Sequence, residues 1–305
     1  MRRSLFVLVL ALVACGKKKS AAPDDAGATP GDAAAAPTTQ SLAEQFDSTC
    51  VAGDLEACRS LAVMYTEGVG VEKDVRRAAA LFGQACNGGN LSACNQVALA
   101  IAEGLGVPKD PPQAVAIYQR TCDAGYTLAC RNLGLMLRDG RGVPADLDRA
   151  AKLLDQACTG GAPFACTNAG DLAAARKDHK TMIARYKQGC DGKDATACRQ
   201  MGVAYLEGIG LPASTSAASV WLDRGCRADD AIACRVLGVL RVNGTGVPRD
   251  VALGTQLLQR ACDRKDADAC TLVAKLAAGS GSAAPTPPAS GSAANAGSAA
   301  VPTAN

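Results

Sequence analysis

Histidine, aromatic residues and an excess of charge are all scarce in this chain of 305 residues. The single histidine, His179, excludes metal sites built from several imidazoles, and it leaves any serine–histidine chemistry to one residue. Lys and Arg number 32 against 29 Asp and Glu, so the net charge of +3 argues against nucleic-acid binding through bulk charge. Aromatic residues make up only 3%, so a folded core has few large side chains to bury.

Cysteine, in contrast, is abundant. The chain has 15 cysteines, a density that is typical of an oxidising compartment or of metal clusters. A structural zinc site needs closely spaced Cys-x2-Cys pairs or histidine partners, and the sequence has neither. We therefore expect no metal and no cofactor, and we interpret the cysteines as disulfide partners.

The N-terminus has the pattern of an export signal. Arg2 and Arg3 precede the apolar stretch 4–14, which is too short to span a bilayer as a helix. The run Leu12-Val-Ala-Cys-Gly16 resembles a bacterial lipobox, in which the cysteine becomes the first residue and is acylated. The resemblance implies a lipoprotein signal peptide at 1–14, lipidation of Cys15 and a cell-envelope protein. Because Gly16 follows the cysteine, the usual sorting pattern favours the outer membrane, with a periplasmic or a surface face.

Two low-complexity segments flank the region that carries the repeats. Residues 15–41 are rich in Ala, Pro, Gly, Asp and Thr and show no apolar periodicity, so they predict a disordered, lipid-anchored linker. Residues 279–305 have no charged residue and predict a second disordered tail. The folded domain is therefore expected at 42–278.

The other fourteen cysteines form seven pairs of identical C-x7-C spacing. The pairs recur every 36 residues, except for one step of 32 between the fourth and the fifth. A fixed period of this length indicates a solenoid of stacked repeats. The pairs are Cys50–Cys58, Cys86–Cys94, Cys122–Cys130, Cys158–Cys166, Cys190–Cys198, Cys226–Cys234 and Cys262–Cys270.

The text between the pairs predicts two helices and a turn in each repeat. Apolar or small residues lie three, four and seven positions after the second cysteine, as in Leu61, Ala62 and Tyr65, which is the spacing of a helical face. A turn such as Gly68–Asp74 follows, with a glycine suited to a helix C-terminus and an aspartate that can cap the next helix. The second helix then runs to the next cysteine. The fold class is therefore all-α.

The spacing within each pair requires a chain reversal. Eight residues of continuous helix would separate the two cysteines by about 12 Å, whereas a disulfide needs Cα atoms about 4.4–6.8 Å apart. The inserts agree, since 87–90 reads Asn-Gly-Gly-Asn, a turn sequence. We expect each bridge to join the end of one helix to the start of the next, although the pairing follows from the repeat alone and other connectivities remain open.

These features together resemble the Sel-one-like repeats, which are relatives of the tetratricopeptide repeat. The cysteine pairs specifically resemble the Helicobacter-type cysteine-rich proteins, and the resemblance covers 42–278. It implies a right-handed αα-repeat solenoid of about seven disulfide-stapled helix pairs. The fourth repeat departs from the pattern, because 171–183 lacks the G-x-G turn and is four residues short.

Members of the cysteine-rich branch often carry a β-lactamase or penicillin-binding label, so this activity is the alternative function. Serine β-lactamases need a Ser-x-x-Lys nucleophile, and the sequence contains none. A metallo-β-lactamase needs several histidine ligands. We therefore assign no catalytic residue and interpret the chain as a non-enzymatic scaffold, with β-lactam hydrolysis left open.

The first helix of each repeat also predicts a binding face. Residues two, five and nine positions after the cysteine share the side opposite the core, so stacking would place amides, aliphatic residues and acids along a concave surface. Arginines one position after the cysteine oppose the helix dipole at a cost of about 0.3–1 kcal/mol, and their presence despite this cost favours a role in binding. The alternative is an ordinary solvated surface. The predicted binding residues are Gln96, Asn132, Asn168, Gln200, Arg59, Arg131, Arg199 and Arg235.

The predicted partner is a protein or peptide, or else a peptidoglycan fragment, because amide side chains pair with a peptide backbone. We expect membrane attachment through the N-terminal lipid, a monomer, and no nucleic-acid partner.

Overall fold

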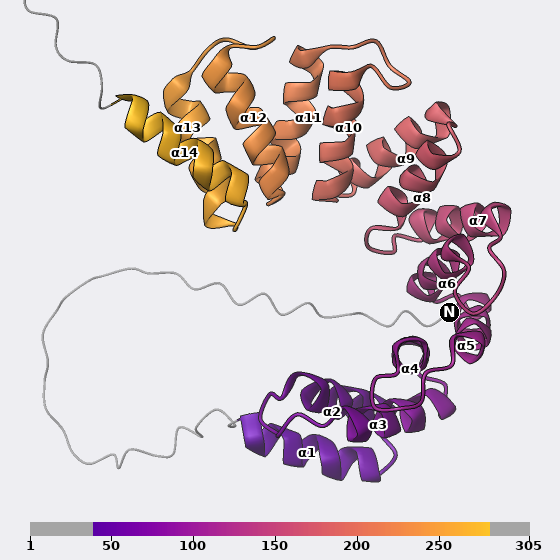
Figure 1. Ribbon diagram of the computed structural model, residues 1–305. Helices are drawn as coiled ribbons and strands as arrows, with labels where there is room; N and C mark the ends of the chain where they lie inside the picture. The colour runs from indigo at the N-terminus through magenta and orange to yellow at the C-terminus, as the bar shows by residue number, and fades with distance from the viewer. Residues whose placement is uncertain (1–38, 281–305) are drawn as a thin grey trace, which may run out of the picture. The chain divides into compact units, whose positions relative to one another are not determined.

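Fourteen α-helices occupy residues 39–280, the part of the chain that the computed structural model describes, and there is no strand within it (Figure 1). These residues belong to one compact unit, which begins at Thr39. The all-α repeat solenoid is thus confirmed. The helices are α1 (Thr39–Val51), α2 (Leu55–Glu67), α3 (Val75–Asn87), α4 (Leu91–Glu103), α5 (Pro111–Asp123), α6 (Thr127–Asp139), α7 (Leu147–Thr159), α8 (Ala165–Ala175), α9 (His179–Asp191), α10 (Ala195–Glu207), α11 (Thr215–Arg227), α12 (Ala231–Asn243), α13 (Val251–Asp263) and α14 (Ala267–Ser280).

The predicted signal peptide, Cys15, most of the linker and most of the C-terminal tail lie outside the described residues. Helix α1 begins three residues before the expected start of the folded domain, and α14 ends two residues after its expected end. The domain boundaries otherwise stay predictions.

Each helix packs against its neighbours along the chain, which is the pattern of a repeat array. The even-numbered helices, which begin each repeat, also approach one another across repeats, as α8 does with α6 and α10, and as α10 does with α12. The odd-numbered helices in the described range approach one another less closely. Helices α6, α8, α10 and α12 thus adjoin one another, and we call the surface formed by the even-numbered helices the even-helix face.

The predicted turn signals cap the helices as expected. Gly68 has φ +76° and ends α2 in the left-handed region, where a glycine pays no steric penalty. Asp74 then begins α3, and its side chain accepts hydrogen bonds from the backbone N–H groups of Arg76 and Arg77. In the loop before α11, where the aspartate is missing, Ser214 performs this role by accepting from the N–H of Ala217.

The second glycine of the G-x-G turn has a separate function, because it lies against the preceding repeat. Gly106 has φ +73°, and a Cβ atom added there would lie 2.3 Å from the carbonyl oxygen of Val75, the first residue of α3. Gly142 meets Pro111 at the start of α5 in the same way. The glycine thus allows two backbones to approach closely and sets the contact between successive repeats.

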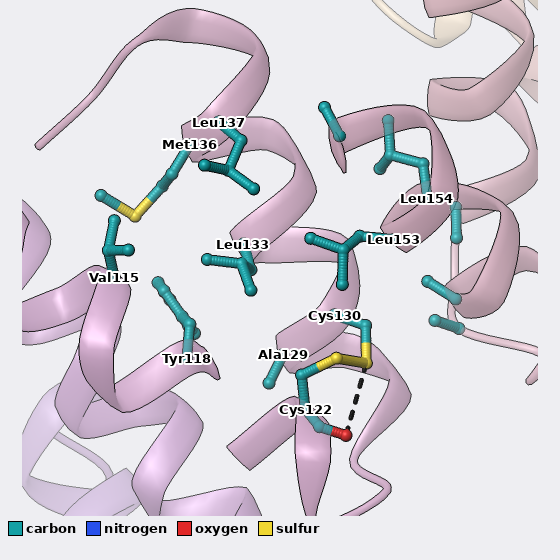
Figure 2. Packing of buried hydrophobic residues seen from close by; sticks show 14 of the residues in the cluster. Val115, Tyr118, Cys122, Ala129, Cys130, Leu133, Met136, Leu137, Leu153 and Leu154 are labelled. Carbon is teal, nitrogen blue, oxygen red and sulfur yellow. Dashed lines mark hydrogen bonds between the residues drawn. A yellow bond between two sulfur atoms is a disulfide. The ribbon is translucent and has the colours of Figure 1, made fainter. Parts of the chain in front are cut away.

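The core is thin and depends on small residues facing large ones. Figure 2 shows Leu133 and Leu137 of α6 among Tyr118 of α5 and Leu154 of α7, and all four side chains are buried. A Cβ atom added to Gly134 would lie 2.9 Å from Cγ of Leu154, so the glycine is the hollow that receives this leucine. Gly202 receives Leu222 and Gly238 receives Leu258 in the same way. Close packing of this kind compensates for the scarcity of aromatic residues.

All seven predicted disulfides are present. Their Cα–Cα distances run from 4.5 to 4.7 Å, and each joins the end of an odd-numbered helix to the start of the next even-numbered one. The predicted chain reversal inside each C-x7-C segment is therefore confirmed. In the chain-entropy description, each closed ring of nine residues stabilises the fold by about 2.6 kcal/mol.

The fourth repeat departs from the others at both of its turns. Ala162 stands where five of the other repeats have a capping Asp or Asn, and α8 begins only after Phe164, which adopts φ +59° without a side-chain cap. The second turn is reduced to Arg176–Asp178. Arg176 extends its guanidinium to the start of the preceding helix α7, where it donates to Asp148 at 2.6 Å. A side chain here makes the contact that a glycine turn makes elsewhere.

Candidate binding surface

A polar network crosses the even-helix face at its centre. Nδ2 of Asn132 on α6 donates to Oδ1 of Asn95 on α4 at 2.9 Å. Nε of Arg131 donates to Oδ1 of Asn168 on α8 at 2.8 Å, and its Nη1 donates to Oδ1 of Asn132 at 3.3 Å. Three successive first helices are therefore joined by side chains, and the structure brings together three of the predicted binding residues.

Asn95 is the buried end of this network. Its side chain is only 3% exposed, so its amide needs an internal partner, which Asn132 supplies. Burial raises the pKa of the neighbouring Tyr118 hydroxyl to about 12, while a hydrogen bond with Asn132 acts in the opposite direction. Asn132 thus lies between a buried phenol, a buried amide and the half-buried Arg131, and it couples the surface of α6 to the core.

Two of the predicted arginines connect one repeat to the next. Nε of Arg199 donates to Oδ2 of Asp230 at 3.0 Å, and Nε of Arg235 donates to Oδ2 of Asp266 at 3.0 Å. Each aspartate also caps the helix that follows it, through its other oxygen. Each arginine is the fifth residue of its helix, just beyond the first turn, so the helix dipole disfavours it less than the sequence predicted, and the ion pair gives a structural reason for its position. A role for these two residues in ligand binding stays a prediction.

The other predicted residues have different surroundings. Arg59 pairs with Glu56 in its own helix, and Nδ2 of Asn90, the cap of α4, donates to the same carboxylate at 3.0 Å. This arginine holds the pKa of the Glu56 carboxyl below its usual range. Gln96 and Gln200 are half-buried, and their side chains make no hydrogen bond within residues 39–280. Their amides are free to meet a ligand.

The aliphatic and acidic rows complete the face. Leu99 on α4 is 39% exposed, and it borders a small apolar niche with Gln96, Phe82 and Leu105. Glu103, at the end of α4, accepts a hydrogen bond from Arg141 at 2.5 Å, which holds the pKa of its carboxyl below the usual range. Glu103 is thus neutralised by an arginine of the next repeat.

Sequence reasoning missed the link between the arginine row and the caps. Thr167 takes the arginine position in the fourth repeat, is buried, and donates to Oδ2 of Asp194 at 2.5 Å. In the second repeat, Asn95 occupies the position that holds an arginine in other repeats. A signal was present, because Arg199 and Arg235 each precede a capping aspartate by 31 residues. Aligning the turns on this offset would have revealed the connection.

Nothing within residues 39–280 forms a cluster of three or more His, Cys, Asp or Glu residues able to hold a metal ion. His179 is exposed at the first position of α9. In this same range, no helix has the length and apolar character needed to cross a membrane.

A model of the Sel1 repeat matches residues 55–90, 91–126, 127–161, 195–230 and 231–266, which together make up more than half of the chain. The chain belongs to the Sel1 repeat family. The resemblance to Sel-one-like repeats is thereby confirmed, and each matched repeat consists of an even-numbered helix followed by an odd-numbered one. The segment 162–194 of this Sel1 repeat protein, which contains its irregular fourth repeat, lies outside the matched ranges.

Solved structures show the same fold. A protective antigen of uropathogenic Escherichia coli with an SLR fold is 23% identical, with a TM-score of 0.67 over 79% of this chain and 52% of that one. A Sel1 repeat protein from Oxalobacter formigenes is also 23% identical, with a TM-score of 0.67 over 78% of this chain and 70% of that one. This Sel1 repeat protein thus spans about half the length of the first and more than two thirds of the second.

Cysteine-rich protein B of Helicobacter pylori is 21% identical, with a TM-score of 0.37 over 42% of this chain and 95% of that one. A search of the curated proteins found no match.

Proposed function

We propose that this Sel1 repeat protein is an envelope-anchored scaffold that binds a protein or peptide through its even-helix face. The observation that carries the proposal is the continuous row of amides on α4, α6, α8 and α10, two of which, Gln96 and Gln200, have no side-chain partner in the described residues. Amide groups pair with the N–H and C=O groups of an extended peptide. Stacked repeats present such groups at regular intervals along one surface.

The apolar niche beside Gln96 supports the same function. Leu99 and the 49% exposed Leu105 border it, and Phe82 forms part of its wall. Apolar side chains beside unpaired amides are the combination that orients a peptide, because the amides fix the backbone and the niche accepts a side chain. Seven disulfides keep this surface ordered and are typical of an oxidising compartment.

A peptide selection tests the proposal. Random peptides displayed on phage are selected on the full, oxidised chain, and an enriched peptide is synthesised and titrated. We expect the double variant Gln96→Ala, Gln200→Ala to weaken binding about tenfold, since each neutral hydrogen bond contributes about 0.5–1.5 kcal/mol. Gln256→Ala, an exposed glutamine on the odd-numbered helix α13, is the matched control. Equal binding by all three proteins would place the site elsewhere and reject the proposal.

Attachment to the envelope rests on the sequence around Cys15. We expect the chain to partition with the outer membrane after fractionation, and Cys15→Ala to release it into the soluble fraction. A wild-type chain that is fully soluble would contradict the anchor while leaving the binding face intact.

A further inference from the structure

Arg131 is the exception in the arginine row. In the equivalent positions, Arg199 and Arg235 are each neutralised by an aspartate 31 residues further along, with N–O distances of 3.0 Å. For Arg131 this offset leads to Ala162, which is buried and carries no acid. Arg131 therefore lacks the carboxylate that Asp230 and Asp266 provide to the other two guanidinium groups. Among the described residues of its own helix, no acid pairs with it as Glu56 pairs with Arg59.

Neutral groups take the place of the missing acid. The amide oxygens of Asn168 and Asn132 accept from Nε and Nη1 of Arg131, and no carboxylate pairs with it within residues 39–280. Its Nη2 group and Nδ2 of Asn168 have no partner in this range. Desolvation lowers the pKa of the guanidinium, yet an arginine remains charged at neutral pH. Arg131 is therefore a half-buried cation. The two asparagine amides orient its guanidinium but do not neutralise the charge.

Asp194, the acid whose charge acts on Arg131, is already engaged. Oδ1 of Asp194 caps α10 by accepting from the N–H of Thr196 at 3.0 Å, and Oδ2 accepts from Oγ1 of Thr167 at 2.5 Å. Asp194 attracts Arg131 from a longer distance without forming an ion pair with it. The departures at Ala162 and Thr167 are complementary. Ala162 leaves Arg131 without an aspartate, and Thr167 leaves Asp194 without an arginine.

Space for a ligand begins where the acid is missing. Ala162 lines a pocket of about 470 Å³, together with Pro163, Phe164, Lys193 and Asp194. Phe164 is 55% exposed, so a large apolar ring lies at the surface beside this pocket. The lining of this pocket combines the apolar Pro163 and Phe164 with the cation of Lys193, and Arg131 lies outside that lining.

We propose that Arg131, positioned by Asn132 and Asn168, binds a carboxylate group of the peptide ligand. Arginine suits this role because its planar fork can form two parallel hydrogen bonds with a carboxylate. The inference rests on the proposed function and names the chemistry of its partner. The carboxylate of the ligand would take the place beside Arg131 that Asp230 and Asp266 take beside Arg199 and Arg235.

The first experiment needs no peptide. Full, oxidised chain labelled with ¹⁵N is titrated with sodium acetate against sodium chloride at equal ionic strength, and the arginine Nε–H signals are followed by NMR. Arg131→Lys, Arg199→Lys and Arg235→Lys assign the three signals. We expect the signal of Arg131 to shift and saturate, whereas Arg199 and Arg235, already paired, stay unchanged. An Arg131 signal that moves no more than the other two overturns the inference, whatever any peptide does.

The second experiment distinguishes the sources of the carboxylate. One peptide pool has a free C-terminus and no Asp or Glu, and a second has an amidated C-terminus and one Glu. We expect one of these two pools to bind, and its carboxylate identifies the source as a C-terminus or a side chain. Arg131→Gln should reduce the affinity of that pool about tenfold or more, and Arg131→Lys should reduce it less. Binding by a third pool that lacks any carboxylate, unaffected by Arg131→Gln, would retain the proposed function and reject this inference.

A gain-of-function variant provides the matched control. Asp230→Asn keeps an oxygen to cap α12 but removes the charge that neutralises Arg199. We expect the Arg199 signal of this variant to become responsive to acetate, while Arg131 responds as before. Intact mass showing all seven disulfides, together with an unchanged circular dichroism spectrum, establishes that each variant is folded. An unresponsive Arg199 in the folded variant would show that an unpaired arginine in this position does not bind carboxylate, and would overturn the inference.

Discussion

The Nε group of Arg199 donates to Asp230 at 3.0 Å across the boundary between two repeats, while the other oxygen of the same carboxylate accepts from the backbone N–H of Ala233 at 2.7 Å. The aspartate thus begins one helix and fixes the preceding one. The two side chains are only 20% and 10% exposed, so water screens their attraction less than it would at an open surface.

A double-mutant cycle measures this connection. We expect Arg199→Gln and Asp230→Asn to show a coupling energy of about 1 kcal/mol in the free energy of unfolding by urea, because the pair is partly shielded. The pair Arg138 and Asp139, whose side chains are 33% and 39% exposed, is the control, and its coupling should be smaller because water screens it more. Equal coupling energies at the two sites would show that the contact between repeats adds nothing.

Glycine substitution separates two kinds of turn. Gly89→Ala affects a residue at φ +98° with nothing within 4 Å, so only the backbone conformation is penalised, at about 1–2 kcal/mol. Gly106→Ala, at φ +73°, also drives a methyl group against the carbonyl of Val75, which should cost about 1–3 kcal/mol more. Urea unfolding of the two variants compares the costs, and similar values would contradict the role of Gly106 in the contact between repeats.

Alkaline pH should destabilise the fold through its buried phenols. Burial raises the pKa of Tyr118 to about 12 from an ordinary value of 10.0, and burial followed by Asp171 raises the pKa of Tyr186. Above pH 10 the unfolded chain therefore loses its tyrosine protons first, and stability falls until the folded state also ionises. We expect Tyr118 to contribute a slope of up to about 1.4 kcal/mol per pH unit between pH 10 and 12.

The variant Tyr118→Phe checks the assignment, because it should lose less stability over this interval than the wild-type chain does. Unfolding in urea at pH 9, 10 and 11 provides the measurement. Parallel curves for the two proteins would mean that Tyr118 ionises as readily when folded as when unfolded.

Hydrolysis of β-lactams is testable directly. We expect the full, oxidised chain to show no turnover of a chromogenic cephalosporin, because the sequence has no Ser-x-x-Lys nucleophile and only one histidine. Intact mass after incubation with a penicillin should show no adduct. A reference β-lactamase is the positive control, and turnover or a stable adduct would replace the scaffold function with a catalytic one.

The sequence predicted those parts of the fold that depend on local chemistry. Gly68 and Asp74 indicate a helix end and a helix start within seven residues, and a disulfide within a C-x7-C pair requires a chain reversal. Contacts between repeats were harder to foresee, because Gly106 touches a residue 31 positions earlier and nothing in its own turn reveals this. The late start of α8 after Phe164 was likewise hidden.

The candidate site was predicted in part for the same reason. Helical periodicity alone places Asn132 and Asn168 on one face, and the structure joins both to Arg131. Periodicity does not reveal which arginine has lost its acid, because that depends on a residue in the following repeat. Asn95, one position away from the predicted amide row, was missed although it forms the buried end of the network.

The position of the seven bridges divides the turns of this chain into two classes. Each bridge spans one of the turns that lead into an even-numbered helix, such as the turn between Cys86 and Cys94. A protease that cleaves inside such a turn leaves its two fragments covalently joined, so the nicked chain stays whole even in denaturant. Cleavage in the glycine turn that follows α4 leaves no covalent link between the two fragments. Seven of the thirteen turns between the fourteen helices of residues 39–280 are thus tolerant of a single cut.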